Sequence, residues 1–299
     1  MNSERMHELP LEGRGAPRLQ RRQGSDYQIT EDERAFFQEH GYLVLRGVLS
    51  PEELAQIEAV FERFRRGEIP NMGKDFCDMS GSLAKRPEEF TLVNAMLPRH
   101  YYPAFQGNLY EQRSQSIARQ LLGDDMQLDY DQFLTKKPER TGAVFAWHQD
   151  MAYWPKKTPD TRTVTCSLAL DDADLENGCL RVVPGSHRAR LRPHRPLAAD
   201  LAIRGEARDG SRDEAHALVM DLATDDEIVY LPVQRGDITL HNEWIVHGSA
   251  GNRSQRFRRT YVIAYRSAAT IARERALGFT HSHNDHANWD TFEQAEGVN

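Results

Sequence analysis

The segment FAWHQDMAYW, residues 145–154, contains two side chains suited to binding a metal ion, His148 and Asp150. On an extended strand the side chains of residues i and i+2 point to the same side, so this imidazole and this carboxylate can bind one ion together. The apolar residues before His148 predict a strand over 144–148. The segment therefore predicts a strand that ends in two of the three protein ligands of a metal ion.

The third ligand is expected in the segment 236–249, which contains His241 and His247. His247 is followed by Gly248 and Ser249, where a strand can end and a small hydroxyl group can face the ion. We therefore favour His247 as the ligand and interpret His241 as a strand histidine held by a hydrogen bond. Two histidines and one carboxylate on one face of iron leave three positions open, an arrangement typical of oxygen-activating non-haem Fe(II) enzymes.

A second His-x-Asp pattern, His283 and Asp285, lies near the C-terminus. No apolar strand leads into this pattern, and its neighbours are mostly polar. We interpret it as part of a polar tail rather than as a metal site.

The overall charge makes nucleic acid and an anionic membrane surface improbable partners. The 299 residues include 38 Lys and Arg against 45 Asp and Glu, which gives a formal net charge of -7. A net negative chain offers no basic field for a phosphate backbone. We therefore expect a small-molecule substrate, no nucleic acid and no membrane partner; the sequence does not predict an oligomeric state.

The cysteines and the N-terminal segment favour a cytoplasmic protein. Cys77, Cys166 and Cys179 are odd in number and widely spaced, unlike a zinc site or a disulfide framework. Residues 1–25 lack the continuous apolar run of a signal peptide or membrane anchor. We expect a disordered tail there.

Two capping signals predict helices near the start of the chain. Thr30 followed by Glu33 predicts a helix that ends at Gly41, and Ser50 followed by Pro51 predicts a helix through residue 66. A further strand, 42–45, and a further helix, 114–122, are expected. The segment 67–102 has no clear periodicity, and it is either a loop that covers a site or a solvated connection.

After residue 125 the hydrophobic pattern changes to short strands. The predicted strands cover residues 126–135, 144–148, 163–170, 179–183, 228–231, 237–241 and 259–265. Many short strands after a few helices predict a mainly β protein with flanking helices (α+β), built on a cupin-like double-sheet jelly roll.

The predicted domain organisation is simple. We expect one domain over 26–270, with a helical part over 26–125 and the jelly-roll core over 126–270. Residues 271–299 would form a C-terminal extension.

A basic segment follows His247 and includes Arg256 and Arg258. A guanidinium group can form two parallel hydrogen bonds with one carboxylate. One arginine near an iron ion with open coordination positions could therefore bind the distal carboxylate of a dicarboxylate. We favour Arg258, and Arg256 is the alternative if the turn is shorter.

In this order the motifs resemble those of the phytanoyl-CoA dioxygenase family of Fe(II)/2-oxoglutarate oxygenases. The resemblance covers roughly residues 30–267, and it rests on HQD (148–150), NGCLRVVPGSH (177–187), Gly236-Asp237, HGS (247–249) and 252–258. It implies a double-stranded β-helix core and Fe(II) bound by His148, Asp150 and His247.

The resemblance also implies how 2-oxoglutarate is bound. Arg258 would bind its distal carboxylate, and Ser249 would make a secondary contact, with O2 as the second cosubstrate. Gln132 and Gln149 are further expected pocket residues. Where some members of the family have a tryptophan beside the cosubstrate, this chain has Ser167. The segment 177–187 is interpreted as structural.

The implied reaction hydroxylates an unactivated C–H bond of a small molecule, such as a natural-product intermediate, while 2-oxoglutarate becomes succinate and CO2. Desaturation, epoxidation and ring formation stay open, whereas a carboxylate at Asp150 argues against halogenation. One alternative is an acyl-CoA hydroxylase. Another, from a different class, is a cupin-like metal-binding protein that oxidises nothing and therefore has no need of Arg258 as a dicarboxylate anchor.

The sequence leaves the substrate open. Large side chains near the ligands either form an aromatic wall or pack in the core; they are Trp147, Met151, Tyr153, Trp154 and Trp244. A basic run either meets an anionic group or is solvated; it contains Arg181, Arg188, Arg190, Arg192, His194 and Arg195.

Overall fold

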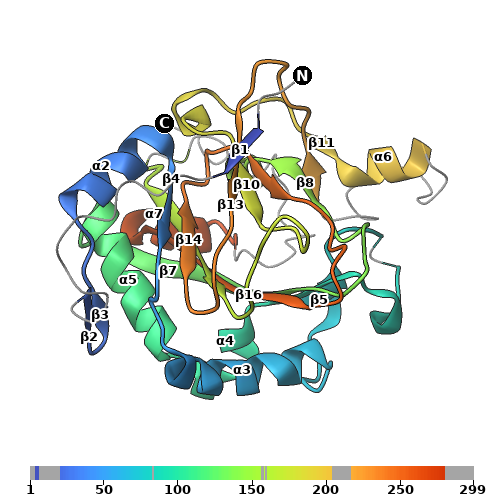
Figure 1. Ribbon diagram of the computed structural model, residues 1–299, viewed down its shortest axis with the longest axis horizontal. Helices are drawn as coiled ribbons and strands as arrows, with labels where there is room; N and C mark the ends of the chain where they lie inside the picture. The colour runs from blue at the N-terminus through green and yellow to red at the C-terminus, as the bar shows by residue number, and fades with distance from the viewer. Residues whose placement is uncertain are drawn as a thin grey trace.

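The computed structural model describes residues 4–6, 21–82, 84–155, 158, 160–203 and 217–279. In these ranges the chain is mainly β, with two large sheets and helices packed against one of them (Figure 1). The helices are α2 (Glu31–His40), α3 (Pro51–Arg65), α4 (Pro98–Tyr101), α5 (Leu109–Leu122), α6 (Leu197–Ile203) and α7 (Ala268–Ala276). None of the helices in these ranges is both long enough and apolar enough to span a bilayer.

The first two long helices begin where their capping residues predict. Thr30 and Ser50 each accept a hydrogen bond from the backbone of a glutamate three residues later, and each glutamate bonds back to the cap. Two orphan N–H groups at each helix start are thereby satisfied. Helix α2 ends at Gly41, which has a φ of 78°. These two helix predictions are confirmed.

The larger sheet has seven strands among the described residues. Its order is β4 (Tyr42–Leu45), β14 (Ile238–His241), β9 (Thr163–Ala169), β16 (Arg258–Ser267), β7 (Met126–Lys136), β6 (Leu92–Met96) and β5 (Phe76–Asp78). The long pairing of β16 with β7 and β9 is antiparallel and forms the centre of this sheet.

The smaller sheet has five strands in the part of the chain that is described. Its order is β1 (Glu4–Met6), β13 (Ile228–Leu231), β10 (Leu180–Val182), β15 (His247–Ser249) and β8 (Phe145–His148). Two short antiparallel strand pairs lie outside both large sheets, β2 (Arg22–Gln23) with β3 (Asp26–Tyr27) and β11 (Arg195–Pro196) with β12 (Leu218–Val219).

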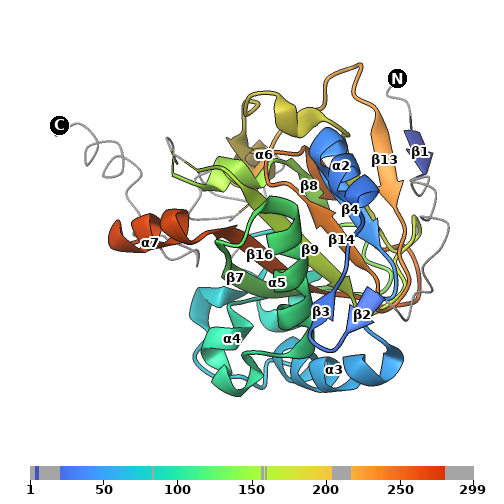
Figure 2. The ribbon, with the colours of Figure 1, turned by 90° about the vertical axis from the view of Figure 1, so that its left-hand side faces the viewer.

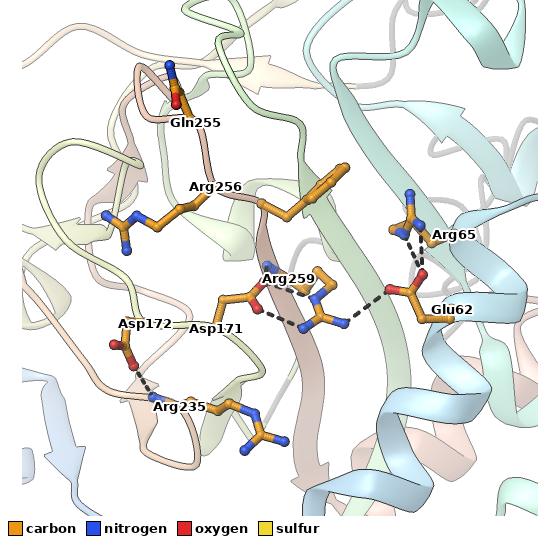
Figure 3. Close-up of a pocket in the computed structure, with 9 residues that line it drawn as sticks. Glu62, Arg65, Asp171, Asp172, Arg235, Gln255, Arg256 and Arg259 are labelled. Atoms are coloured by element: carbon orange, nitrogen blue, oxygen red, sulfur yellow. Dashed lines mark hydrogen bonds and ion pairs between the residues drawn. The ribbon is translucent and has the colours of Figure 1, made fainter. Parts of the chain in front are cut away.

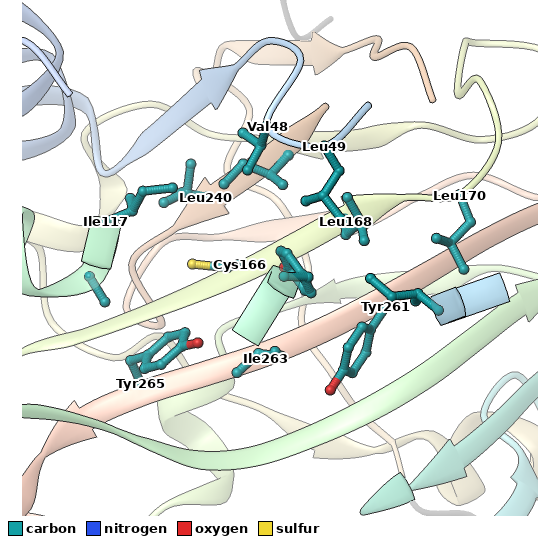
Figure 4. Close-up of a cluster of buried hydrophobic side chains, with 14 of the residues drawn as sticks. Val48, Leu49, Ile117, Cys166, Leu168, Leu170, Leu240, Tyr261, Ile263 and Tyr265 are labelled. Carbon is teal, nitrogen blue, oxygen red and sulfur yellow. The ribbon is translucent and has the colours of Figure 1, made fainter. Parts of the chain in front are cut away.

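The two faces of the larger sheet have different partners. Alternate residues of β9 and β16, such as Cys166, Leu168 and Ile263, pack against α3 and α5 in one hydrophobic cluster (Figure 4). The residues between them face the smaller sheet, where Val44 and Ala169 pack against Val182. This alternation follows from the two-residue period of a strand. As a result, some polar side chains of the larger sheet point into the space between the two sheets.

The predicted strands after residue 125 are all present, with ends that differ by one or two residues. The segment 67–102 is not one irregular loop, because β5 and β6 extend the larger sheet there. Met79 and Ser80, in the connection between these strands, line a pocket that includes His148. Every residue of β6 is buried, so its sequence does not alternate between apolar and polar. The predicted helix 114–122 begins five residues earlier, after the cap Asn108.

Two boundary predictions also need correction. Glu4–Met6 pairs with β13 and Arg22–Gln23 pairs with Asp26–Tyr27, so these parts of the expected disordered tail are strands. Helix α7 crosses the predicted boundary at residue 270. The rest of the expected tail and most of 271–299 lie outside the described residues.

Replacing Phe61 with alanine is expected to lower the free energy of unfolding by about 3–5 kcal/mol. The Phe61 ring is buried, and its centroid lies 4.5 Å from that of Phe133 on β7. The neighbouring Val60→Ala is the control, because Val60 is only partly buried and should cost about 1 kcal/mol. Urea unfolding measures both variants, and equal losses would contradict this account of the helix–sheet interface.

Candidate metal centre and cosubstrate cavity

The strand pairing of β8 with β15 brings two histidines together. His148 is the last residue of β8, His247 is the first of β15, and the two are direct partners in the antiparallel register. Their ring centroids are 4.2 Å apart. Asp150 begins a short 3-10 turn, η4 (Asp150–Tyr153), just after β8. One ligand atom from each of these three residues lies within 4.8 Å of the other two.

The imidazole groups are oriented for binding through Nε2. His148 Nδ1 is 2.7 Å from the carbonyl oxygen of Ala146, and His247 Nδ1 is 3.1 Å from that of Ile245. A neutral imidazole that donates its Nδ1–H to a carbonyl has its lone pair on Nε2. Both Nε2 atoms face one carboxylate oxygen, Asp150 Oδ1, at 3.1 Å for His148 and 3.6 Å for His247.

The electrostatics favour the protonation states that bind a metal. Burial alone would raise the pKa of Asp150, but His247 and hydrogen bonds from the other histidines hold it well below its usual range. Burial lowers the pKa of His247 well below its usual value. Metal ligands must be an ionised carboxylate and neutral imidazoles. The donor set therefore fits a divalent ion that prefers nitrogen and oxygen ligands, such as Fe(II).

A third histidine lies beside this group. His241, the last residue of β14, has its Nε2 3.2 Å from Asp150 Oδ2, and its ring centroid is 4.2 Å from that of His247. This hydrogen bond agrees with the interpretation of His241 as a strand histidine. Its Nδ1 is buried, with no hydrogen-bond partner among the described residues.

The loop that carries Asp150 is fixed by a buried ion cluster that sequence reasoning missed. The amide of Met151 donates to the backbone carbonyl of Glu243 at 3.1 Å, and the Glu243 side chain pairs with Arg266. Burial raises the pKa of Glu243 to about 8. Arg266 is itself 1% exposed and also pairs with Glu274 at 3.3 Å. Nothing in the local sequence signals this cluster, because its members come from distant segments.

Arg258 is the first residue of β16, and its side chain faces the space between the sheets. It lines a narrow cavity with Ser167, Thr239 and Thr260. Its Nε is buried and has no hydrogen-bond partner in the described part of the chain. Burial lowers the pKa of this guanidinium group. A guanidinium group with a buried, unpartnered Nε beside hydroxyl groups fits a bound carboxylate.

A buried lysine beside Arg258, Lys136, was missed by sequence reasoning. Lys136 is 1% exposed, it is the direct partner of Arg258 in the β7–β16 register, and its Nζ donates to the carbonyl of Ala250. Burial, Arg258 and Arg181 lower its pKa well below the usual value. In the printed sequence Lys136 stands next to Lys137 before a turn, so it looks like a surface residue.

The alternative prediction, that Arg256 instead of Arg258 holds the dicarboxylate, is wrong. Its side chain is exposed and pairs with Asp174 at 2.6 Å on the outside of the molecule. It lines an open groove of about 580 Å³ in which several of the other charged side chains form ion pairs (Figure 3). In that groove Arg259 pairs with Asp171 and Glu62. The turn is long enough that Arg258, not Arg256, begins the inward-facing register.

The predicted glutamines lie in different places. Gln132 is on the inward face of β7, in register with Val262. Gln149 points away from His148 and Asp150, and its amide bonds the carbonyl of Trp244 at 2.7 Å and the amide of Arg192 at 2.8 Å. Gln149 therefore ties loops together instead of lining a cosubstrate pocket, which corrects that prediction.

Ser249 and the segment 177–187 lie next to this site. Ser249 is buried two residues after His247, on the same strand. Gly178 has a φ of 76°, and a Cβ there would lie 2.1 Å from the carbonyl oxygen of Ala250. His187 bonds the carbonyl of Gln38 in α2 at 3.1 Å. These contacts agree with a structural role for 177–187.

The predicted aromatic wall divides into two groups. Trp147 and Tyr153 line a pocket of about 390 Å³ that also includes His148. The other three residues pack in a core cluster with Tyr130 and Ala264; they are Met151 and Trp154, in and just after the 3-10 turn that begins at Asp150, and Trp244, in the loop after β14. For these three, core packing replaces the predicted substrate contact. The second His-x-Asp pattern, at His283, lies outside the described residues.

Comparison with known proteins agrees with this geometry. The model of the phytanoyl-CoA dioxygenase (PhyH) family matches residues 37–260. The chain belongs to this family. The match includes His148, Asp150, His247 and Arg258, so the whole candidate site lies inside it.

Two relatives align with most of the length of this chain. A probable alpha-ketoglutarate-dependent hypophosphite dioxygenase from Stutzerimonas stutzeri is 28% identical over 242 residues, which are 80% of this chain and 79% of the relative. The peroxisomal phytanoyl-CoA dioxygenase of Rattus norvegicus is 25% identical over 246 residues, covering 80% of this chain and 69% of the relative.

A solved structure has the same fold. EvdO2 from Micromonospora carbonacea var. aurantiaca, complexed with 2-oxoglutarate, aligns with a TM-score of 0.61 and 24% identity. The alignment covers 81% of this chain and 92% of that protein. At this identity the likeness shows the fold.

Replacing His247 with alanine is expected to weaken Fe(II) binding by roughly 100-fold or more, because one of three converging ligand atoms is lost. His187→Ala is the matched control, since His187 is a half-buried histidine whose ring bonds α2 instead of Asp150. Anaerobic equilibrium dialysis against Fe(II) measures both variants. Unchanged affinity in the folded His247 variant would contradict the assignment of this ligand.

Proposed function

We propose that this protein is a non-haem Fe(II)/2-oxoglutarate-dependent dioxygenase that hydroxylates an unactivated C–H bond of a small molecule, such as a natural-product intermediate. The observation that carries the proposal is the convergence of His148, Asp150 and His247 on one point, together with the unpaired Arg258 in the same inter-sheet space. Family membership supports the same conclusion.

The three ligands would hold Fe(II) from one side. With both Nε2 atoms and one carboxylate oxygen on that side, further positions stay open for other groups. Bound Fe(II) would supply the activation of O2 that converts 2-oxoglutarate to succinate and CO2 and oxidises the substrate. His241 would hold the second oxygen of Asp150, so that this carboxylate binds through Oδ1.

Arg258 and Lys136 would hold the distal carboxylate of 2-oxoglutarate. Like charges directly opposite one another on neighbouring strands destabilise a sheet, and a buried charge without a partner costs more. In the described part of the chain no carboxylate lies within ion-pair distance of either side chain. A bound dicarboxylate would neutralise this pair, with Ser249 as a nearby hydroxyl group.

The remaining parts of the proposal concern the core and the substrate. We propose that the two facing sheets form a double-stranded β-helix, that residues 26–270 are one catalytic domain, and that Gln132 borders the cosubstrate. The pocket beside His148 would receive the substrate, with Trp147 and Tyr153 in its wall. A metal-binding protein without oxygenase activity would not need the basic pair Arg258 and Lys136 between the sheets.

Anaerobic addition of Fe(II) and 2-oxoglutarate is expected to produce a weak visible metal-to-ligand charge-transfer band. Arg258→Met should weaken 2-oxoglutarate binding by roughly 10- to 100-fold, because a charge-assisted bond contributes about 1.5–3 kcal/mol. Fe(II) binding should be unchanged. Absence of the band in wild-type protein that binds Fe(II) would overturn the proposed function.

Lys136→Met is expected to weaken 2-oxoglutarate binding without lowering the stability of the protein. Removal of a buried, uncompensated cation is expected to leave the unfolding midpoint of the cosubstrate-free protein unchanged or higher, while 2-oxoglutarate affinity falls roughly tenfold. The adjacent Lys137→Met is the control, since Lys137 is partly exposed and does not face Arg258. Lower stability with unchanged 2-oxoglutarate affinity would assign Lys136 a purely structural role.

A further inference from the structure

The pocket beside His148 has a mixed lining. Much of its wall is apolar, and the apolar residues come from the β5–β6 connection, β8, α6 and β12; they include Met79, Phe145, Trp147, Leu197, Leu218 and Met220. Besides His148, its ionisable groups in the described residues are Tyr153, Arg181, Arg195 and Asp200. A pocket of about 390 Å³ in volume with few polar groups selects a substrate through those groups.

Arg195 is already neutralised by its neighbours. Its guanidinium group bonds Asp200 at 3.0 Å and Asp221 at 2.9 Å, on both of its edges. The hydroxyl group of Tyr153 accepts a hydrogen bond from the amide of Leu218 at 2.7 Å. These groups therefore have partners before any substrate arrives.

Arg181 differs because its charge has no partner. No carboxylate of the described residues lies within ion-pair distance of Arg181, and its Nε is buried without a hydrogen-bond partner. Arg181 therefore brings a positive charge without a counter-charge, and a guanidinium group with N–H donors, to the lining of the pocket.

The Arg181 side chain is also held in place. Its Cζ lies 4.3 Å from the centroid of the Trp147 ring, a cation–π contact. The residue opposite Arg181 in the β10–β15 register is Gly248, so no side chain stands between Arg181 on β10 and Trp147 on β8. A cation fixed in this way loses little conformational entropy when it binds an anion.

We propose that the substrate of this enzyme carries an anionic group, a carboxylate or a phosphate, that Arg181 binds, while the apolar remainder of the substrate occupies the pocket beside His148. The proposal rests on the function proposed above and adds the substrate class. Arg181 thus acts as a specificity residue, separate from Arg258, which holds the cosubstrate on the other side of β10 between the sheets.

The test uses protein loaded anaerobically with Fe(II) and saturating 2-oxoglutarate, so that the cosubstrate site is filled. The probes are straight-chain carboxylates and alkyl phosphates of four to twelve carbons, each compared with the neutral amide or alcohol of the same length. Isothermal titration calorimetry measures binding, and the charge-transfer band reports on the cosubstrate. The variants are Arg181→Gln and, as a charge-matched control, Arg190→Gln, because Arg190 is exposed and does not line the pocket.

Wild-type protein is expected to bind at least one class of anionic probe tenfold or more tightly than its neutral partner. Arg181→Gln should remove this preference, and Arg190→Gln should retain it. Comparison of the carboxylate and phosphate series identifies which anion the site prefers.

Three results would overturn the inference. These are a lack of anion preference in wild-type protein, a preference that survives in Arg181→Gln, and loss of the charge-transfer band in that variant, which would assign Arg181 to the cosubstrate. Absence of the band in wild-type protein would instead contradict the proposed function, so the two failures are distinguishable.

Discussion

The antiparallel register between β8 and β15 is the constraint on which the site depends. It sets His148 directly opposite His247, so both imidazole groups enter the inter-sheet space at one level. A shift of either strand by one residue would turn its histidine to the outer face of the sheet. Gly248 helps to fix this register, because a Cβ there would lie 2.9 Å from the carbonyl oxygen of Phe145.

The interior of this protein combines two opposite electrostatic arrangements. Behind Asp150, Arg266 is surrounded by carboxylates, and burial raises the pKa of Glu243 to about 8. Toward the other end of β16, Arg258 faces Lys136 with no acid in reach among the described residues. The first arrangement pairs its cation with carboxylates of the protein and lies next to the loop that carries Asp150. The second has no carboxylate partner among the described residues, so it differs from a structural ion cluster and offers a site for an anion.

Local signals in the sequence predicted the parts of the fold that depend on a few adjacent residues. The capping boxes at Thr30 and Ser50 are complete within four residues, so the helices could be assigned without knowledge of the tertiary structure. Strand β6 could not be assigned in this way. It is buried on both faces between β5 and β7, and its apolar run follows a segment rich in Gly and Pro.

The same distinction explains which site residues could be predicted. His148 and Asp150 share a strand end, and the motif around His247 is equally local, so their chemistry is visible in the printed sequence. Lys136 gives no such signal, because a lysine pair before a turn normally lies in solvent. Its burial is set by pairing with Arg258, a residue more than a hundred positions away in the chain. The sequence therefore identifies His148, Asp150, His247 and Arg258 from local motifs, whereas the position of Lys136 beside Arg258 becomes visible only when strand pairing brings the two together.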